Sequence, residues 1–285
     1  EAISQASANQ RKGRCGRVAE GVCLRLYSEE DFDARPEFTE PEIRRTNLAA
    51  VILQMLRLRL GDIAKFPFLE PPDTRQVKDG VALLRELSAV DERGQITAMG
   101  AKMARFPVDP RFSHMLLAAG EAGCVREVMV IVSGLSVQDP RERPTEKQQV
   151  ADECHRRFLH KRSDFMAWLS LWDYCEEQRQ SLSRNQWRKR ARKEYLSHTR
   201  LLEWRDIHFQ LTLACRQAGL KMNAEAAGYD AIHQSLLSGL LGNLAQWDEG
   251  HRYRGARNSQ LQIFPGSALF KVKPKWMMAA EIVET

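Results

Sequence analysis

The chain has 285 residues, of which 43% are hydrophobic and 28% charged, so it has the composition of an ordinary globular protein and can bury a sizeable core. No apolar run reaches the roughly 18 residues of a membrane span and no signal sequence precedes the first residues, so we expect a soluble, cytoplasmic protein, not bound to a membrane, whose true N-terminus is missing. The 6 cysteines include no C-x-x-C pair, which argues against a metal site or a disulfide framework, and the net charge of +6 permits a polyanionic partner.

Residues 7–17 read SANQRKGRCGR and form the most informative segment. If they continue as one helix, Gln10, Arg14 and Arg17 project from one face, because they are spaced by four and three residues. Guanidinium groups suit phosphate oxygens, so this face favours an anionic ligand. Two alternatives remain open: a basic surface helix that ends at Gly16, and the GxxG loop of a KH module.

Residues 22–27, VCLRLY, alternate in polarity as a half-buried strand does. A parallel sheet needs several strands with crossover helices between them, so residues 1–38 are too few for a complete α/β domain. We therefore expect them to be the C-terminal end of one.

The next 67 positions, residues 39–105, have the outline of a winged helix. Residues 39–42, TEPE, match a capping box and predict a helix that ends near Gly61. A second helix is predicted from Asp73, then two short strands around Gly94, and then a helix capped by Thr97. The apolar faces of the first two helices are predicted to comprise Leu48, Val51, Ile52 and Met55, and Val77, Val81, Leu84 and Leu87.

Residues 106–249 have a helical pattern that predicts a bundle of six or seven helices. Trp168, Leu171, Trp172 and Cys175 recur at helical spacing behind Ser163, a candidate cap, and indicate core packing rather than a ligand site. Residues 152–155 spell DECH, which matches the D-E-x-H letters of a Walker B metal-binding motif. A polar helical stretch precedes them where that motif needs a buried strand, so we interpret them as structural.

Two basic segments are candidates for contact with nucleic acid. Residues 184–193 carry six basic side chains without an acidic one, and Trp187 lies among them either as a platform for base stacking or as part of the bundle core. Residues 250–285 alternate in places as strands do and contain no acidic residue before Glu281; they predict a β module too short for the five strands of an OB barrel. The candidate nucleic-acid-binding residues are Arg188, Lys189, Arg190, Arg254, Arg257 and Lys271.

Residues 10–17, QRKGRCGR, resemble motif VI of superfamily 2 helicases, and the lead-in ISQASAN resembles that of the DEAH-box RNA helicases. The succession of motif VI, winged helix, ratchet domain and OB-fold also resembles that family, and the details are most similar to its bacterial HrpA type. The stretches that carry this likeness are residues 135–144, 203–207, 253–258 and 263–267. Cys15 replaces the usual alanine and Phe264 the usual histidine.

The resemblance implies a mainly α fold with four parts: the end of the second RecA-like domain in residues 1–38, a winged helix in 39–105, a helical ratchet domain in 106–249, and the start of an OB-fold, truncated, in 250–285. It implies a 3′-to-5′ type RNA helicase that hydrolyses ATP with Mg²⁺, in which Gln10, Arg14 and Arg17 reach the γ-phosphate and the two arginines act as arginine fingers. Single-stranded or structured RNA and the missing N-terminal RecA-like domains of the same chain are the expected partners. Without those domains, we expect no ATPase activity and no bound cofactor.

Two other classes of function are consistent with parts of the pattern. A winged-helix regulator would read DNA or RNA with the helix that starts at Asp73, but the basic and acidic residues of that helix balance. A helical scaffold without a nucleic-acid role would leave the basic segments as solvated faces.

Overall fold

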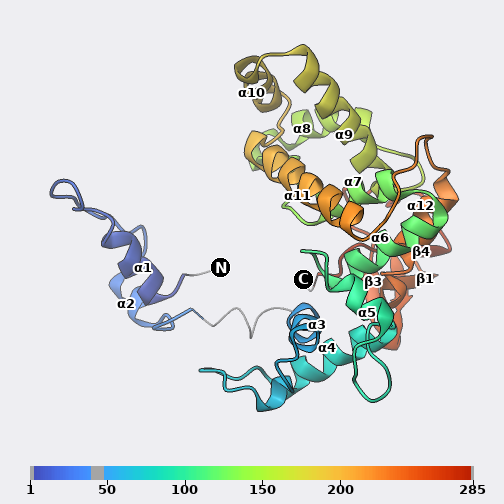
Figure 1. Ribbon diagram of the computed structural model, residues 1–285. Coiled ribbons are helices and arrows are strands. Elements are labelled where there is room, and N and C mark those ends of the chain that lie inside the picture. Colours follow the sequence, from blue (N-terminus) through green and yellow to red (C-terminus); the bar gives the residue numbers. More distant parts are fainter. Residues whose placement is uncertain (1–2, 40–47, 284–285) are drawn as a thin grey trace.

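A computed structural model describes residues 3–39 and 48–283 (Figure 1). These residues form twelve α-helices and one four-stranded sheet, which confirms the mainly helical fold predicted from the sequence. Among them, no helix is long and apolar enough to cross a membrane. The α-helices are α1 (Gln5–Lys12), α2 (Glu29–Asp33), α3 (Ala49–Leu58), α4 (Thr74–Glu86), α5 (Ala98–Met103), α6 (Pro110–Ala122), α7 (Val125–Leu135), α8 (Gln148–His155), α9 (Asp164–Ser181), α10 (Arg184–Lys193), α11 (His198–Gln217) and α12 (Tyr229–Leu237).

Residues 3–39 form a small unit around α1 and α2, drawn in dark blue in Figure 1. The backbone N–H of Gln5 donates to the carbonyl of Pro36 at 3.0 Å, which closes the segment on itself. The strand predicted for residues 22–27 is wrong: Val22, Leu24 and Leu26 are 85–99% exposed and the backbone there is not paired. A strand needs a neighbour for its N–H and C=O groups, and the described residues supply none beside this segment.

Helices α3, α4 and α5 and one isolated β-bridge follow the order predicted for a winged helix. Asp73 caps α4, Val90 pairs with Ile96 across a turn at Gly94, and the Thr97 hydroxyl accepts from the N–H of Gly100 at the start of α5. The predicted capping box at residues 39–42 lies mostly outside the described residues. Val51 is 36% exposed, so it was wrongly assigned to the buried face of α3 with Leu48, Ile52 and Met55, each at most 6% exposed.

Helices α6 to α12 form the predicted bundle, for which six or seven helices were expected. Its central side chain is Trp204 of α11, which is 1% exposed and packs edge-on against Trp168 and Trp172 of α9 at centroid distances of 5.1 and 5.0 Å. This confirms core packing for Trp168, Leu171 and Cys175, whereas Trp172 is only half-buried. The Ser163 side chain does not cap α9; its hydroxyl hydrogen-bonds His233 of α12 instead, at 2.7 Å.

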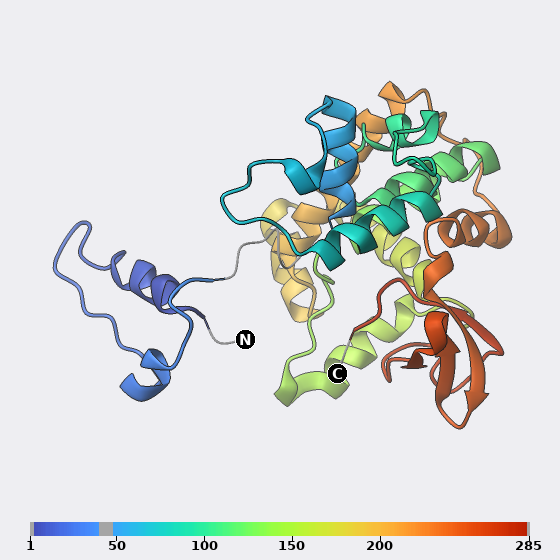
Figure 2. The ribbon, with the colours of Figure 1, turned by 90° about the horizontal axis from the view of Figure 1, so that it is seen from below.

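The sheet has the order β3-β2-β1-β4 with antiparallel pairs. Its strands are β1 (Leu244–Glu249), β2 (Arg252–Gly255), β3 (Gln260–Gln262) and β4 (Trp276–Met278). The helical pattern was expected to reach Glu249, but β1 begins at Leu244 because it pairs with β2 on one side and β4 on the other. Pairing on both sides outweighs the local helix preference of LAQWDE. The sheet lies beside the bundle (Figure 2), where Asp164 at the start of α9 accepts from the N–H of Ala268 at 3.1 Å.

Candidate nucleic-acid interface

In residues 7–17, the segment predicted to bind phosphate, the helix ends earlier than expected. Helix α1 stops at Lys12, Gly13 caps it, and the backbone then turns through Gly16, whose φ of +87° is outside the helical region. Gln10, Arg14 and Arg17 are exposed, but they do not share one helix face. The single-face interpretation and the helix ending at Gly16 are therefore wrong, because glycine favours a helix end and a left-handed turn.

Helix α10 presents its basic residues to solvent and buries its tryptophan. Trp187 is 6% exposed and lies edge-on to Tyr174 of α9 at 6.2 Å between ring centroids. The alternative in which Trp187 belongs to the bundle core is thus confirmed, and the interpretation as a stacking platform is wrong. Arg188, Lys189 and Arg190 are all exposed on this helix.

Among the basic side chains of α10, Arg188, Lys189 and Arg190 differ in their partners. Arg190 contacts Glu194 at 3.2 Å, and the same carboxylate accepts from Tyr174 at 2.6 Å and Arg157 at 2.7 Å. Burial raises the pKa of Glu194, but these hydrogen bonds outweigh it and the pKa lies below its usual value, so Glu194 stays ionised. Arg188 and Lys189 form no ion pair among the residues that the structure describes, so both remain available for phosphates.

A row of polar and aromatic residues crosses the sheet. Gln260, Arg254, Gln246 and Trp276 are direct cross-strand partners on β3, β2, β1 and β4, and all four are exposed, Trp276 to 57%. Arg254 forms an ion pair with Asp248 at 2.9 Å. Because paired residues in a sheet project on the same side, the row forms one continuous track.

Of the other basic candidates, Arg257 and Lys271 lie on exposed connections outside the strands. Sequence reasoning selected Arg254, Arg257 and Lys271 but missed Gln246, Gln260 and Trp276. The alternation within residues 250–285 indicated strands, but the row depends on the pairing register of four strands, which no local pattern gives.

The DECH residues lie on a helix and make structural contacts. Asp152 accepts two hydrogen bonds from Arg143 at 2.6 and 2.8 Å, and this pair holds the pKa of Asp152 below its usual value. His155 is 6% exposed and hydrogen-bonds the carbonyls of Glu194 and Tyr195, while burial lowers its pKa. Over residues 3–39 and 48–283, no three His, Cys, Asp or Glu side chains come together as metal ligands would.

Three family models match consecutive parts of the chain. The winged-helix helicase-associated domain (HA2) matches residues 80–108, the ratchet-like helicase-associated domain (HA2) matches residues 109–200, and the oligonucleotide/oligosaccharide-binding (OB)-fold matches residues 232–285. The chain therefore contains the three kinds of domain that its pattern predicted. Their exact limits stay predictions.

The chain is also similar over its whole length to named proteins. It is 56% identical over 293 residues to an ATP-dependent RNA helicase HrpA homolog of Haemophilus influenzae and 56% identical over 291 residues to ATP-dependent RNA helicase HrpA of Escherichia coli; both alignments cover 100% of this chain. It is 31% identical over 286 residues to a probable ATP-dependent RNA helicase, DHX35, of Homo sapiens, and this alignment covers 99% of the chain. The chain spans 22% of the length of the two bacterial relatives and 40% of the human one.

Proposed function

We propose that this chain, which carries the helicase-associated winged-helix, ratchet-like and OB-fold domains of HrpA-type RNA helicases, contacts RNA within an ATP-dependent RNA helicase of the 3′-to-5′ type. The observation that carries the proposal is the 56% identity over the whole chain to proteins named ATP-dependent RNA helicases. Its role in the longer protein is to couple ATP hydrolysis to movement of the RNA.

The charge distribution supports contact with the RNA backbone. Arg188 and Lys189 are exposed and unpaired within the described ranges, and Arg254, Arg257 and Lys271 are exposed in or near the sheet. Basic side chains that neutralise phosphates give affinity without sequence preference, and Trp276 offers an exposed ring on which a base can stack. We therefore assign single-stranded or structured RNA as the ligand of these surfaces.

The ATP-related role rests on the resemblance of residues 10–17 to motif VI. Gln10, Arg14 and Arg17 are assigned to the γ-phosphate of ATP, which the RecA-like domains of the longer protein would hold together with Mg²⁺. The 285 residues contain no G-x-x-x-x-G-K-[ST] loop to cradle phosphates, so the chain on its own is expected not to hydrolyse ATP. The exposed turn after α1 leaves both arginines accessible to a facing domain.

The test is RNA-stimulated ATP hydrolysis by the longer protein. Arg14→Ala or Arg17→Ala should lower kcat by about 10³-fold or more with RNA binding retained, because arginine fingers stabilise charge in the transition state. Arg11→Ala and Lys12→Ala are matched controls from the same segment and should have a much smaller effect. Equal losses in all four variants, or a loss of RNA binding together with kcat, would refute the assignment.

A further inference from the structure

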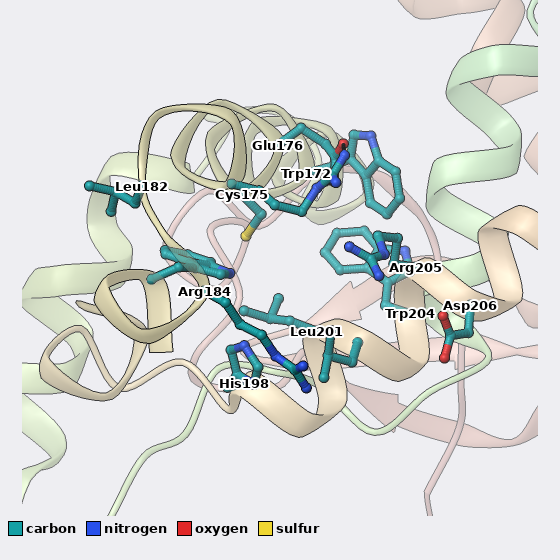
Figure 3. A pocket seen from close by; sticks show the side chains of 13 residues that line it. Trp172, Cys175, Glu176, Leu182, Arg184, His198, Leu201, Trp204, Arg205 and Asp206 are labelled. Carbon is teal, nitrogen blue, oxygen red and sulfur yellow. Dashed lines mark hydrogen bonds and ion pairs between the residues drawn. The ribbon is translucent and has the colours of Figure 1, made fainter. Parts of the chain in front are cut away.

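A cleft of about 490 Å³ opens between α9, α10 and α11 (Figure 3). Its inner wall is made by the indoles of Trp172, Trp187 and Trp204, and its rim carries charged side chains from all three helices. Among them, Arg184 lies at the start of α10 and Arg205 lies on α11.

The charged side chains that line the cleft are three arginines, Arg179, Arg184 and Arg205, and two carboxylates, Glu176 and Asp206. Glu176 pairs with Arg179 at 2.6 Å, so this carboxylate is already occupied. Neither Arg184 nor Arg205 forms an ion pair or a side-chain hydrogen bond within the described part of the chain, although both line the cleft and Arg205 is half-buried. Arg184 is exposed, whereas Arg205 is a half-buried guanidinium without a partner, and such a group favours an anionic ligand.

His198, the first residue of α11, adds a third polar group. Figure 3 shows its ring beside Arg184. Burial together with Arg184, Arg188 and Arg205 lowers the pKa of His198, so its imidazole is neutral near pH 7 and can donate one hydrogen bond. Arg184, His198 and Arg205 all line the cleft, whereas Arg188 lies outside its lining.

The aromatic wall is held firmly in place. The ring of Trp172 is half-buried and lies against His208 at 4.4 Å, while Trp204 Nε1 donates to the carbonyl of Val130 at 3.1 Å and to Ser133 at 3.0 Å. Burial raises the pKa of the neighbouring Cys175 thiol to about 12, so this part of the wall is uncharged. A preformed aromatic wall costs little entropy when a planar ring binds against it.

We propose that this cleft binds a phosphorylated nucleotide, with the phosphate among Arg184, His198 and Arg205 and the base against the indole of Trp172. Its volume lies in the range of about 300–1,000 Å³ that is usual for small-molecule sites. The ligand is either one nucleotide of a nucleic-acid strand or a free nucleotide, because both present the same phosphate ester. The assignment to a nucleic-acid strand rests on the proposed function, contact with RNA. The assignment of the cleft to a phosphorylated nucleotide does not.

Tryptophan fluorescence of the whole chain tests the proposal directly, because three of its 6 tryptophans line the cleft. Titration with AMP should change the emission, and adenosine should not, since it lacks the phosphate. Arg184→Ala and Arg205→Ala should each weaken AMP binding by about tenfold or more, the usual cost of a lost charge-assisted hydrogen bond. Arg192→Ala, an exposed arginine of α10 outside the cleft, is the matched control and should bind AMP as the wild type does.

A uridine oligoribonucleotide with a 5′ phosphate then identifies the source. Displacement of AMP by the oligonucleotide assigns the site to a nucleic-acid strand, and binding of AMP without displacement assigns it to a free nucleotide. The proposal would be overturned if AMP did not change the tryptophan emission or if adenosine changed it equally. It would also be overturned if Arg184→Ala and Arg205→Ala, with wild-type circular dichroism, both kept the wild-type affinity for AMP. None of these readouts involves ATP hydrolysis, so failure of the helicase assignment would remain distinguishable from failure of the site.

Discussion

Replacement of Trp204 tests whether the bundle that shapes the cleft is organised as described. The side chain is 1% exposed, contacts two other indoles edge-on, and donates from Nε1 to Val130 and Ser133. Trp204→Ala removes all of these contacts and leaves a large cavity, so the free energy of unfolding should fall by about 3–5 kcal/mol. Trp204→Phe keeps a ring but loses the N–H donor and part of the packed surface, so a loss of about 1–3 kcal/mol is expected.

Urea denaturation followed by helical circular dichroism measures this difference. The matched control is Phe209→Ala on the same helix, because Phe209 is 63% exposed and its loss should change the free energy of unfolding by less than about 1 kcal/mol. If Trp204→Ala cost no more than Phe209→Ala, Trp204 would not be a central contact of the bundle and the cleft wall would lose its physical basis.

Two further predictions concern local contacts. Glu127 is 7% exposed; burial raises the pKa of its carboxyl, but hydrogen bonds from Asn223, the backbone and Arg126 outweigh this and leave the pKa below the usual 4.5. The charged form of Glu127 therefore stabilises the fold above pH 4.5, and this stabilisation is lost as the pH falls toward the folded-state pKa. Between neutral pH and about pH 3.5, the melting temperature of the wild type should fall more than that of Glu127→Gln. Parallel curves of melting temperature against pH for the two proteins would contradict this. Gly100→Ala would place a Cβ against the carbonyl oxygen of Ala89, inside van der Waals contact, so it should lower the free energy of unfolding by about 1–3 kcal/mol. Lys102→Ala on the same helix, an exposed site, should change it little, and equal stabilities of the two variants would show that α5 does not pack as described.

The helices that the sequence predicted well are those with local start signals and a repeated apolar face. Asp73 and Thr97 cap α4 and α5 where expected, and the spacing of Trp168, Leu171 and Cys175 identified a buried face. In such segments the information lies within one turn of the chain, so the pattern alone is sufficient.

The failures occurred where distant residues decide the outcome. Residues 22–27 alternate like a strand but lack a neighbour in the described chain, and β1 is a strand because β2 and β4 flank it. Likewise, only the packing of α10 against Tyr174 determines that Trp187 is buried. The cleft joins residues from 172 to 206 on three helices, so no spacing along the chain could have identified it.

The measurement that most directly tests RNA contact is the salt dependence of single-stranded RNA binding by the purified chain. Each phosphate that a basic side chain neutralises should contribute about −0.7 to the slope of log K against log salt concentration. We expect the wild-type chain to bind RNA weakly with little sequence preference. Two triple variants should bind RNA more weakly and show a flatter slope: Arg188→Glu/Lys189→Glu/Arg190→Glu and Arg254→Glu/Arg257→Glu/Lys271→Glu. Unchanged affinity and slope in both triple variants would contradict the assignment of these surfaces to RNA.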